Sequence, residues 1–175
     1  SADLYQQILD AETFGISVGD VTFDLAKMVD QSRQAAQQLS QGVAQLMKKN
    51  KVKIFSGEAS ITGIGEVHVN GETLITDSII VASGAEQKSL GPIAIDGQNI
   101  WGAREAMTPS KLPKKLLIVG AGAIGVEFAS FYRSLGSTVT LLEVAPDILP
   151  SEDQEISRLA RAALVGRGTE LLKGT

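Results

Sequence analysis

A helical spacing of apolar residues runs through the first third of the chain. Between about Thr22 and Asn50, positions separated alternately by four and three residues are apolar apart from one serine: Leu25, Val29, Ser32, Ala36, Leu39, Val43 and Leu46. This period predicts one long amphipathic helix, preceded by a shorter helix over residues 3–11. We expect the long helix to pack on its own domain. A coiled-coil or partner-binding helix is the alternative, which the small Ala36 and the interior Gly42 disfavour.

Residues 52–81 change to the short alternation that is typical of strands. Val67-His68-Val69 leads into Asn70-Gly71, and residues 72–75 follow. Because an Asn-Gly pair accepts positive φ at both positions, this segment predicts a β-hairpin. The apolar runs at 52–55 and 79–81 predict further strands, the second one buried. Glycines and prolines then punctuate residues 86–113, which indicates an irregular connection.

From Lys114 onward the pattern is β-α-β-α. The continuous apolar run over residues 116–119 is typical of a parallel strand covered on both faces. An amphipathic helix is expected from about residue 123 to 135, and a second strand over residues 138–142. Ser151 to Gln154 reads as a capping box that opens another helix, and Leu171-Leu172 would begin a third strand. The pattern therefore predicts an α/β fold.

Composition and charge exclude several classes of function. The 175 residues are 43% hydrophobic and 21% charged, which indicates a globular protein rather than a disordered one. The formal charge is −4 and there is no basic block, so neither nucleic acid nor a polybasic membrane surface is an expected partner. The longest apolar run, residues 116–126, is too short to span a bilayer, and no secretory signal is recognisable.

The chain contains no cysteine and one histidine, His68. These counts exclude a disulfide scaffold, thiol chemistry, a zinc cluster and a Ser-His-Asp triad built from this chain alone. His68 is expected on an exposed strand and not as a catalytic base. We therefore expect no catalytic residue and no metal site here. The chain also begins within an amphipathic pattern and without Met, which indicates an internal piece of a longer protein.

A glycine motif follows the apolar strand at residues 116–119. Its residues, Gly120-Ala121-Gly122-Ala123-Ile124-Gly125, fit G-x-G-x-x-G, and Glu143 closes the second strand 21 positions after Gly122. The glycines alone are weak evidence. Between a buried strand and an amphipathic helix, with an acid after the next strand, they predict a dinucleotide-binding β-α-β unit. The alternative is a doubly wound fold in which the glycines serve packing only.

Each position of the motif has a physical reason. Gly120 permits the sharp turn, a side chain at Gly122 would collide with the pyrophosphate, and Gly125 lets the helix lie close to the strand. The Glu143 carboxylate would accept hydrogen bonds from the adenosine ribose. No arginine follows among residues 144–147, so NAD is expected rather than NADP. From physics alone, Glu127 complements the helix dipole.

Long stretches of the sequence resemble the dihydrolipoyl dehydrogenases, which are flavoprotein disulfide reductases. The clearest stretch is residues 112–136, which include the glycine motif, and the likeness continues through Leu142-Glu143 and residues 147–156. Upstream, four more segments are similar to the same family: residues 14–16, 46–52, 57–59 and 79–85. The resemblance covers nearly the whole chain and is loosest over residues 86–105.

The resemblance implies how the chain is organised. Residues 1–85 would be the latter part of the first FAD-domain segment, a long helix plus a β-meander. Residues 86–111 would connect this segment to residues 112–175, the truncated first part of a Rossmann-type βαβα NAD-binding domain. The residues that would bind FAD are Ala59, Ser83, Gly84 and Ala85. Those that would bind NAD are Gly120, Ala121, Gly122, Ala123, Ile124, Gly125, Val126, Glu127 and Glu143, with Glu127 near the nicotinamide.

The resemblance also implies an activity for the complete protein. Protein-bound dihydrolipoamide would be oxidised through a disulfide and FAD, with NAD⁺ as hydride acceptor. Its partners would be lipoyl domains of 2-oxoacid dehydrogenase complexes and a second copy in a homodimer, in the bacterial cytoplasm or the mitochondrial matrix. This chain lacks the family's redox cysteines, first FAD fingerprint and His-Glu pair, so alone it is expected to be inactive. The alternatives are another reductase of the family, such as a glutathione or mercuric reductase, or a non-catalytic NAD-binding or interaction module. The missing arginines disfavour a glutathione reductase.

Overall fold

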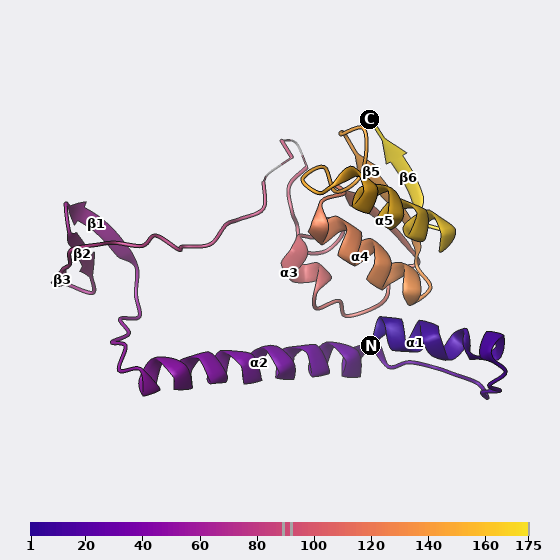
Figure 1. Ribbon diagram of the computed structural model, residues 1–175, viewed down its shortest axis with the longest axis horizontal. Coiled ribbons are helices and arrows are strands. Elements are labelled where there is room, and N and C mark those ends of the chain that lie inside the picture. Colours follow the sequence, from indigo (N-terminus) through magenta and orange to yellow (C-terminus); the bar gives the residue numbers. More distant parts are fainter. Residues whose placement is uncertain (89, 92, 175) are drawn as a thin grey trace. The chain divides into compact units, whose positions relative to one another are not determined.

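The computed structural model describes residues 1–88, 90, 91 and 93–174 (Figure 1). The chain divides into two compact units. One contains Ser1–Gln31 and Gly91–Thr175, and the other contains Ser32–Leu90. The first unit holds the predicted dinucleotide-binding segment.

The first unit is built on a parallel sheet of three strands with the order β4-β5-β6. The strands are β4 (Lys115–Val119), β5 (Thr138–Glu143) and β6 (Glu170–Lys173), and the connecting helices are α4 (Ala123–Ser134) and α5 (Gln154–Gly166). The predicted β-α-β-α order is confirmed, and so is the third strand.

The core of this unit lies on one face of the sheet. Tyr132 from α4, Val139 and Leu141 from β5 and Leu164 from α5 belong to one buried cluster, so both helices contribute to the same core. On β4 the burial alternates, and Leu117 is 59% exposed. The expectation of a strand covered on both faces is therefore wrong for the described structure, because no described element packs over the face that carries Leu117.

Capping at the helix ends differs in part from the sequence prediction. Helix α5 begins after Asp153, whose carboxylate accepts the Glu155 N–H at 2.8 Å, so Asp153 and not Ser151 is the N-cap. The connection at 86–113 also contains a short helix, α3 (Ala103–Ala106). The buried Tyr132 hydroxyl donates to the Ala106 carbonyl at 2.7 Å and ties this connection to α4.

The amino-terminal helices form where the apolar spacing placed them. They are α1 (Ala2–Leu9), the 3₁₀ helix η1 (Ala11–Phe14) and α2 (Leu25–Lys49). No described residue of α2 is buried, and Leu39 on its apolar seam is 72% exposed. The expectation that α2 packs on its own domain is therefore not met in the described structure, where nothing covers the seam.

The second unit contains an antiparallel meander of β1 (Ala59–Gly63), β2 (Glu66–Val69) and β3 (Glu72–Ile75). Asn70 and Gly71 turn between β2 and β3 with φ of 52° and 80°, which confirms the predicted hairpin. His68 is half-buried on β2, with Nδ1 3.3 Å from the Thr73 hydroxyl on β3.

The strands predicted at residues 52–55 and 79–81 are wrong. Neither segment is a strand in the described structure, and Ile54 and Ile80 are 61% and 91% exposed. A strand needs neighbours that satisfy its N–H and C=O groups. No described strand pairs with either segment, so the β-favouring side chains alone do not impose the conformation.

Candidate functional site

The glycine motif forms the turn between β4 and α4. Gly120 has φ +101°, a left-handed conformation that glycine adopts without steric cost. Its N–H donates to the Leu142 carbonyl at 2.8 Å, which fixes the turn to the end of the neighbouring strand β5. The motif therefore lies at the carboxyl edge of the parallel sheet, where ligands of open α/β sheets bind.

Gly122 and Gly125 have different surroundings. A Cβ atom built on Gly125 collides with the Gly120 carbonyl oxygen, so close packing within the chain explains that glycine. A Cβ atom on Gly122 meets nothing within 4 Å, and the φ of −71° and ψ of −177° there are extended backbone open to any residue. The protein itself does not require glycine at this position. A ligand that approached the backbone closely would require it.

The amino terminus of α4 faces the same turn. The first intrahelical bond runs from the Val126 N–H to the Gly122 carbonyl at 3.0 Å, so the N–H groups of residues 123–125 precede the helical ladder. Such N–H groups and the positive end of the helix dipole bind phosphate. Together with the open space at Gly122, this turn fits a dinucleotide pyrophosphate.

Glu143 connects β5 to the glycine turn. One carboxylate oxygen accepts the Ala121 N–H at 2.6 Å and the other accepts the Ala145 N–H at 2.8 Å. The backbone bond from Ala145 and then that from Ala121 lower the pKa of Glu143, so the group is an ionised acceptor at neutral pH. Each oxygen retains a lone pair that a ribose hydroxyl could use, although only 7% of the residue is exposed.

The loop after β5 also holds the glycine turn. The Leu149 N–H donates to the Ala121 carbonyl at 2.8 Å, so one backbone group of the fully buried Ala121 is paired with the last residue of β5 and the other with the loop after it. Leu149 adopts a positive φ of 49°, which is uncommon outside glycine. These bonds attach the turn to β5 and to the loop that follows it.

Sequence reasoning missed a cluster of charges beside this loop, formed by Asp147, Arg161 and Lys173 and called the Asp147 cluster below. Arg161 Nη1 lies 2.9 Å from one Asp147 carboxylate oxygen, and Lys173 Nζ lies 3.8 Å from the other. The sequence prediction searched only residues 144–147 for a cation. Parallel pairing of the third strand could have placed Lys173 beside Glu143, because these two are register partners. No sequence signal pointed to Arg161.

The hydrogen bonds of the glycine turn do not involve Glu127 or the residues ascribed to FAD. Glu127 is exposed on α4, and its role near the nicotinamide stays a prediction. Ala59 is exposed on β1, paired with Val69, whereas Ser83, Gly84 and Ala85 lie exposed in an irregular segment. The flavin contacts of these residues also stay predictions.

We therefore expect the 175-residue chain to purify without colour. The four residues ascribed to FAD are all exposed, and a flavin held only by exposed residues would exchange freely with solvent. The visible absorption spectrum of the purified chain, recorded after saturation with FAD and desalting, checks this. Stoichiometric flavin absorption would contradict it.

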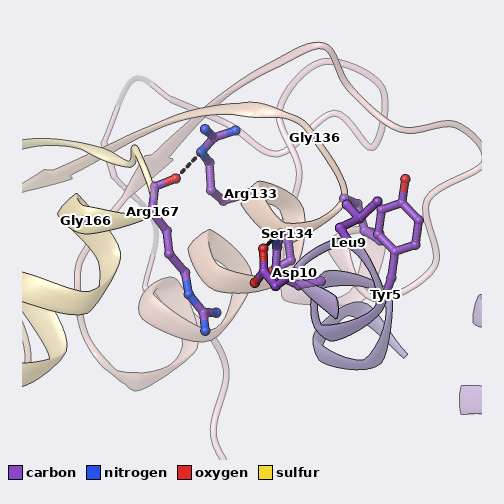
Figure 2. A pocket seen from close by; sticks show the side chains of 10 residues that line it. Tyr5, Leu9, Asp10, Arg133, Ser134, Gly136, Gly166 and Arg167 are labelled. Atoms are coloured by element: carbon purple, nitrogen blue, oxygen red, sulfur yellow. Dashed lines mark hydrogen bonds between the residues drawn. The ribbon is translucent and has the colours of Figure 1, made fainter. Parts of the chain in front are cut away.

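A groove of about 420 Å³ lies at the opposite end of α4 from the glycine turn (Figure 2). Tyr5 and Leu9 from α1 line it together with Arg133 and Gly136. The Arg133 Nε–H donates to the Arg167 carbonyl at 2.7 Å, so this guanidinium is hydrogen-bonded within the chain. None of the predicted cofactor residues lines the groove, and we assign it no ligand.

The described residues contain no group of three or more His, Cys, Asp or Glu side chains placed to hold a metal ion. Among them, no helix combines the length and apolar character that crossing a membrane requires.

Comparison with known proteins gives a consistent set of relatives. The family of pyridine nucleotide-disulphide oxidoreductases matches residues 4–175. The dihydrolipoyl dehydrogenase of Zymomonas mobilis is 41% identical over 98% of this chain and 38% of its own length. A dihydrolipoyl dehydrogenase of Bacillus subtilis is 36% identical over 98% of this chain and 39% of its length. The chain thus spans about two fifths of these curated relatives.

Solved structures show the same fold. LpdA from Mycobacterium tuberculosis superposes with a TM-score of 0.83 at 24% identity, over 99% of this chain and 39% of that protein. The HOCl-induced flavoprotein disulfide reductase RclA from Escherichia coli superposes with a TM-score of 0.74 at 22% identity, over 100% of this chain and 39% of that protein.

Proposed function

The chain belongs to the pyridine nucleotide-disulphide oxidoreductase family, and we propose that it carries the NAD-binding site of a dihydrolipoyl dehydrogenase. The observation that carries the nucleotide site is the contrast between two glycines. Gly125 is explained by contact with the chain, whereas Gly122 borders open space at a helix amino terminus. The names of the relatives supply the choice of dehydrogenase.

Different residues at the turn would bind different parts of the nucleotide. The N–H groups at the start of α4 would hold the pyrophosphate, and the Glu143 carboxylate would accept a hydrogen bond from the adenosine ribose. By resemblance, Glu127 would lie near the nicotinamide. When bound, NAD⁺ supplies the acceptor for a hydride. The protein's own task is to fix the dinucleotide at the edge of the sheet.

The expected preference for NAD follows from the state of Glu143. The low pKa of this carboxylate, due first to the Ala145 N–H, keeps it ionised at neutral pH. An ionised carboxylate cannot donate a hydrogen bond to the additional phosphate of NADP and repels its charge. NAD has a ribose hydroxyl at that position, which can donate to the carboxylate.

The other properties of the whole enzyme are proposed from the relatives' names and from the resemblance. They are FAD as second cofactor, protein-bound dihydrolipoamide as electron donor, lipoyl domains as partners, a homodimer, and a location in the bacterial cytoplasm or the mitochondrial matrix. The sulfur chemistry would need cysteines, which this chain does not contain. The second candidate is another disulfide reductase of the family. RclA, which is described as a flavoprotein disulfide reductase, shares the fold with this chain.

The activity is tested with two proteins, the 175-residue chain and the same chain flanked by the remaining segments of the Zymomonas mobilis relative. We expect the chain alone to form no NADH from dihydrolipoamide, because it has no cysteine to pass electrons. The extended protein is expected to bind flavin and to form NADH, which is followed by its absorbance. The intact relative is the matched control. An extended protein that binds flavin but reduces only another disulfide, such as glutathione disulfide, with NADPH would support the second candidate instead.

A further inference from the structure

Strand pairing and hydrogen bonds connect the Asp147 cluster to Glu143, the residue expected to bind ribose. Lys173 on β6 is the register partner of Glu143 on β5. The next residue, Gly174, donates its N–H to the Ala145 carbonyl at 3.2 Å, and Ala145 donates to Glu143 at 2.8 Å. Asp147 itself follows on the same loop, with its carboxylate accepting the Ile148 N–H at 2.9 Å.

The cluster is also partly shielded from water. The side chains of Arg161 and Asp147 are 32% and 31% exposed, and that of Lys173 is 38% exposed. Charges at this depth are screened less than fully exposed ones. Their signs would therefore influence a phosphate that approached the adenosine end of the proposed nucleotide site.

Charge balance around the loop depends on Asp147. Glu143 and Asp147 carry two negative charges, and Arg161 and Lys173 carry two positive charges. Arginine near the ribose is the group that accommodates the extra phosphate of NADP in this class of fold. In this chain the arginine of the cluster is Arg161, and its Nη1 donates to the Asp147 carboxylate at 2.9 Å.

We propose that Asp147 is a positioning residue that sets the preference for NAD over NADP, by holding Arg161 and balancing the charge of Lys173. The proposal rests on the proposed nucleotide site. It adds a second determinant to the Glu143 carboxylate, since a nucleotide with a 2′-phosphate would find the cations of the loop already engaged. Removing the Asp147 charge would leave a net positive loop beside the ribose.

The test compares NADH and NADPH binding to the unaltered chain and to three variants, at a temperature where circular dichroism shows each protein folded. Asp147→Asn is expected to tighten NADPH binding about three- to tenfold, the gain of one partly exposed charge-assisted contact, and to change NADH binding less than about twofold. Asp147→Glu keeps the charge and is expected to behave like the unaltered chain. Arg161→Gln added to Asp147→Asn is expected to cancel the gain.

Salt dependence gives a readout that a merely structural role would not move. NADPH binding to Asp147→Asn is expected to weaken more steeply with ionic strength than NADPH binding to the unaltered chain. The proposal is overturned if the ratio of the two affinities is the same in Asp147→Asn, or if Arg161→Gln fails to reverse the change. In both cases NADH binding to the unaltered chain leaves the proposed nucleotide site standing. Absence of that binding would overturn the site and this inference together.

Discussion

Valine at position 122 is expected to weaken NADH binding at least tenfold, about 1.4 kcal/mol, and to leave the thermal stability of the chain unchanged. A Cβ at this position meets no atom of the protein within 4 Å, and the backbone there is extended, so the chain itself leaves room for a Cβ. The same side chain would occupy the space into which the pyrophosphate must come. Fluorescence titration with NADH and thermal melting by circular dichroism measure the two effects.

The matched control is valine at position 125. Here the Cβ collides with the Gly120 carbonyl oxygen, a backbone atom that cannot move without opening the turn. Overpacking of this kind costs about 1–3 kcal/mol or more, so we expect a clearly lower melting temperature. The two variants thus separate a glycine needed by a ligand from one needed by the fold. Equal loss of stability in both variants would show that Gly122, like Gly125, serves packing. Full NADH affinity in Gly122→Val would remove Gly122 from the nucleotide site.

Glu143→Ala is expected to weaken NADH binding about tenfold to a few hundredfold, the value of a charge-assisted hydrogen bond plus the disturbance of the turn. The difference between NADH and NADPH affinities should also narrow, because the repulsion of the extra phosphate is removed. Titrations of both nucleotides at pH 7, where the lowered pKa keeps Glu143 ionised, measure the two changes.

A control for the general loss of a carboxylate is Glu170→Ala. Glu170 is the first residue of β6 and the register partner of Thr140, which lies three residues before Glu143 on β5. The Glu170 carboxylate accepts a hydrogen bond from the Thr140 hydroxyl at 2.8 Å. Glu170→Ala should therefore leave NADH binding unchanged. Glu143→Ala also leaves the N–H groups of Ala121 and Ala145 without their acceptor, so its melting temperature should fall as well. NADH binding that survives Glu143→Ala unaltered would remove this residue from the ribose site.

Those parts of the fold that local pattern determines were predictable from the sequence. The β4-α4-β5-α5-β6 order follows from apolar strands, an amphipathic period and glycines at the ends, and each strand finds its partner inside the same segment. Residues 52–55 and 79–81 carry the same β-favouring side chains but have no described strand beside them. The apolar seam of α2 likewise specified a helix, yet it could not specify what covers that helix.

The candidate site divides in the same way. The glycine spacing and the position of Glu143 gave the turn and the acid, because both depend on short-range order. That the Glu143 carboxylate reaches back to the Ala121 N–H, at a separation of 22 residues, depends on the pairing of β4 with β5. Arg161 depends on the packing of α5 and follows from no local signal. Residues 144–147, which directly follow β5, contain no cation. The fold nevertheless brings Arg161 and Lys173 to Asp147 on this loop.

The most direct test of a nucleotide site at the glycine turn is a competition titration of the unaltered 175-residue chain. NADH is bound first, its fluorescence is followed, and NADPH is then added as competitor under the same buffer and salt. We predict saturable binding of NADH and at least about tenfold weaker binding of NADPH, as expected from one lost hydrogen bond and a repelled phosphate. Equal affinities for the two nucleotides, or no saturable binding of NADH, would contradict the account.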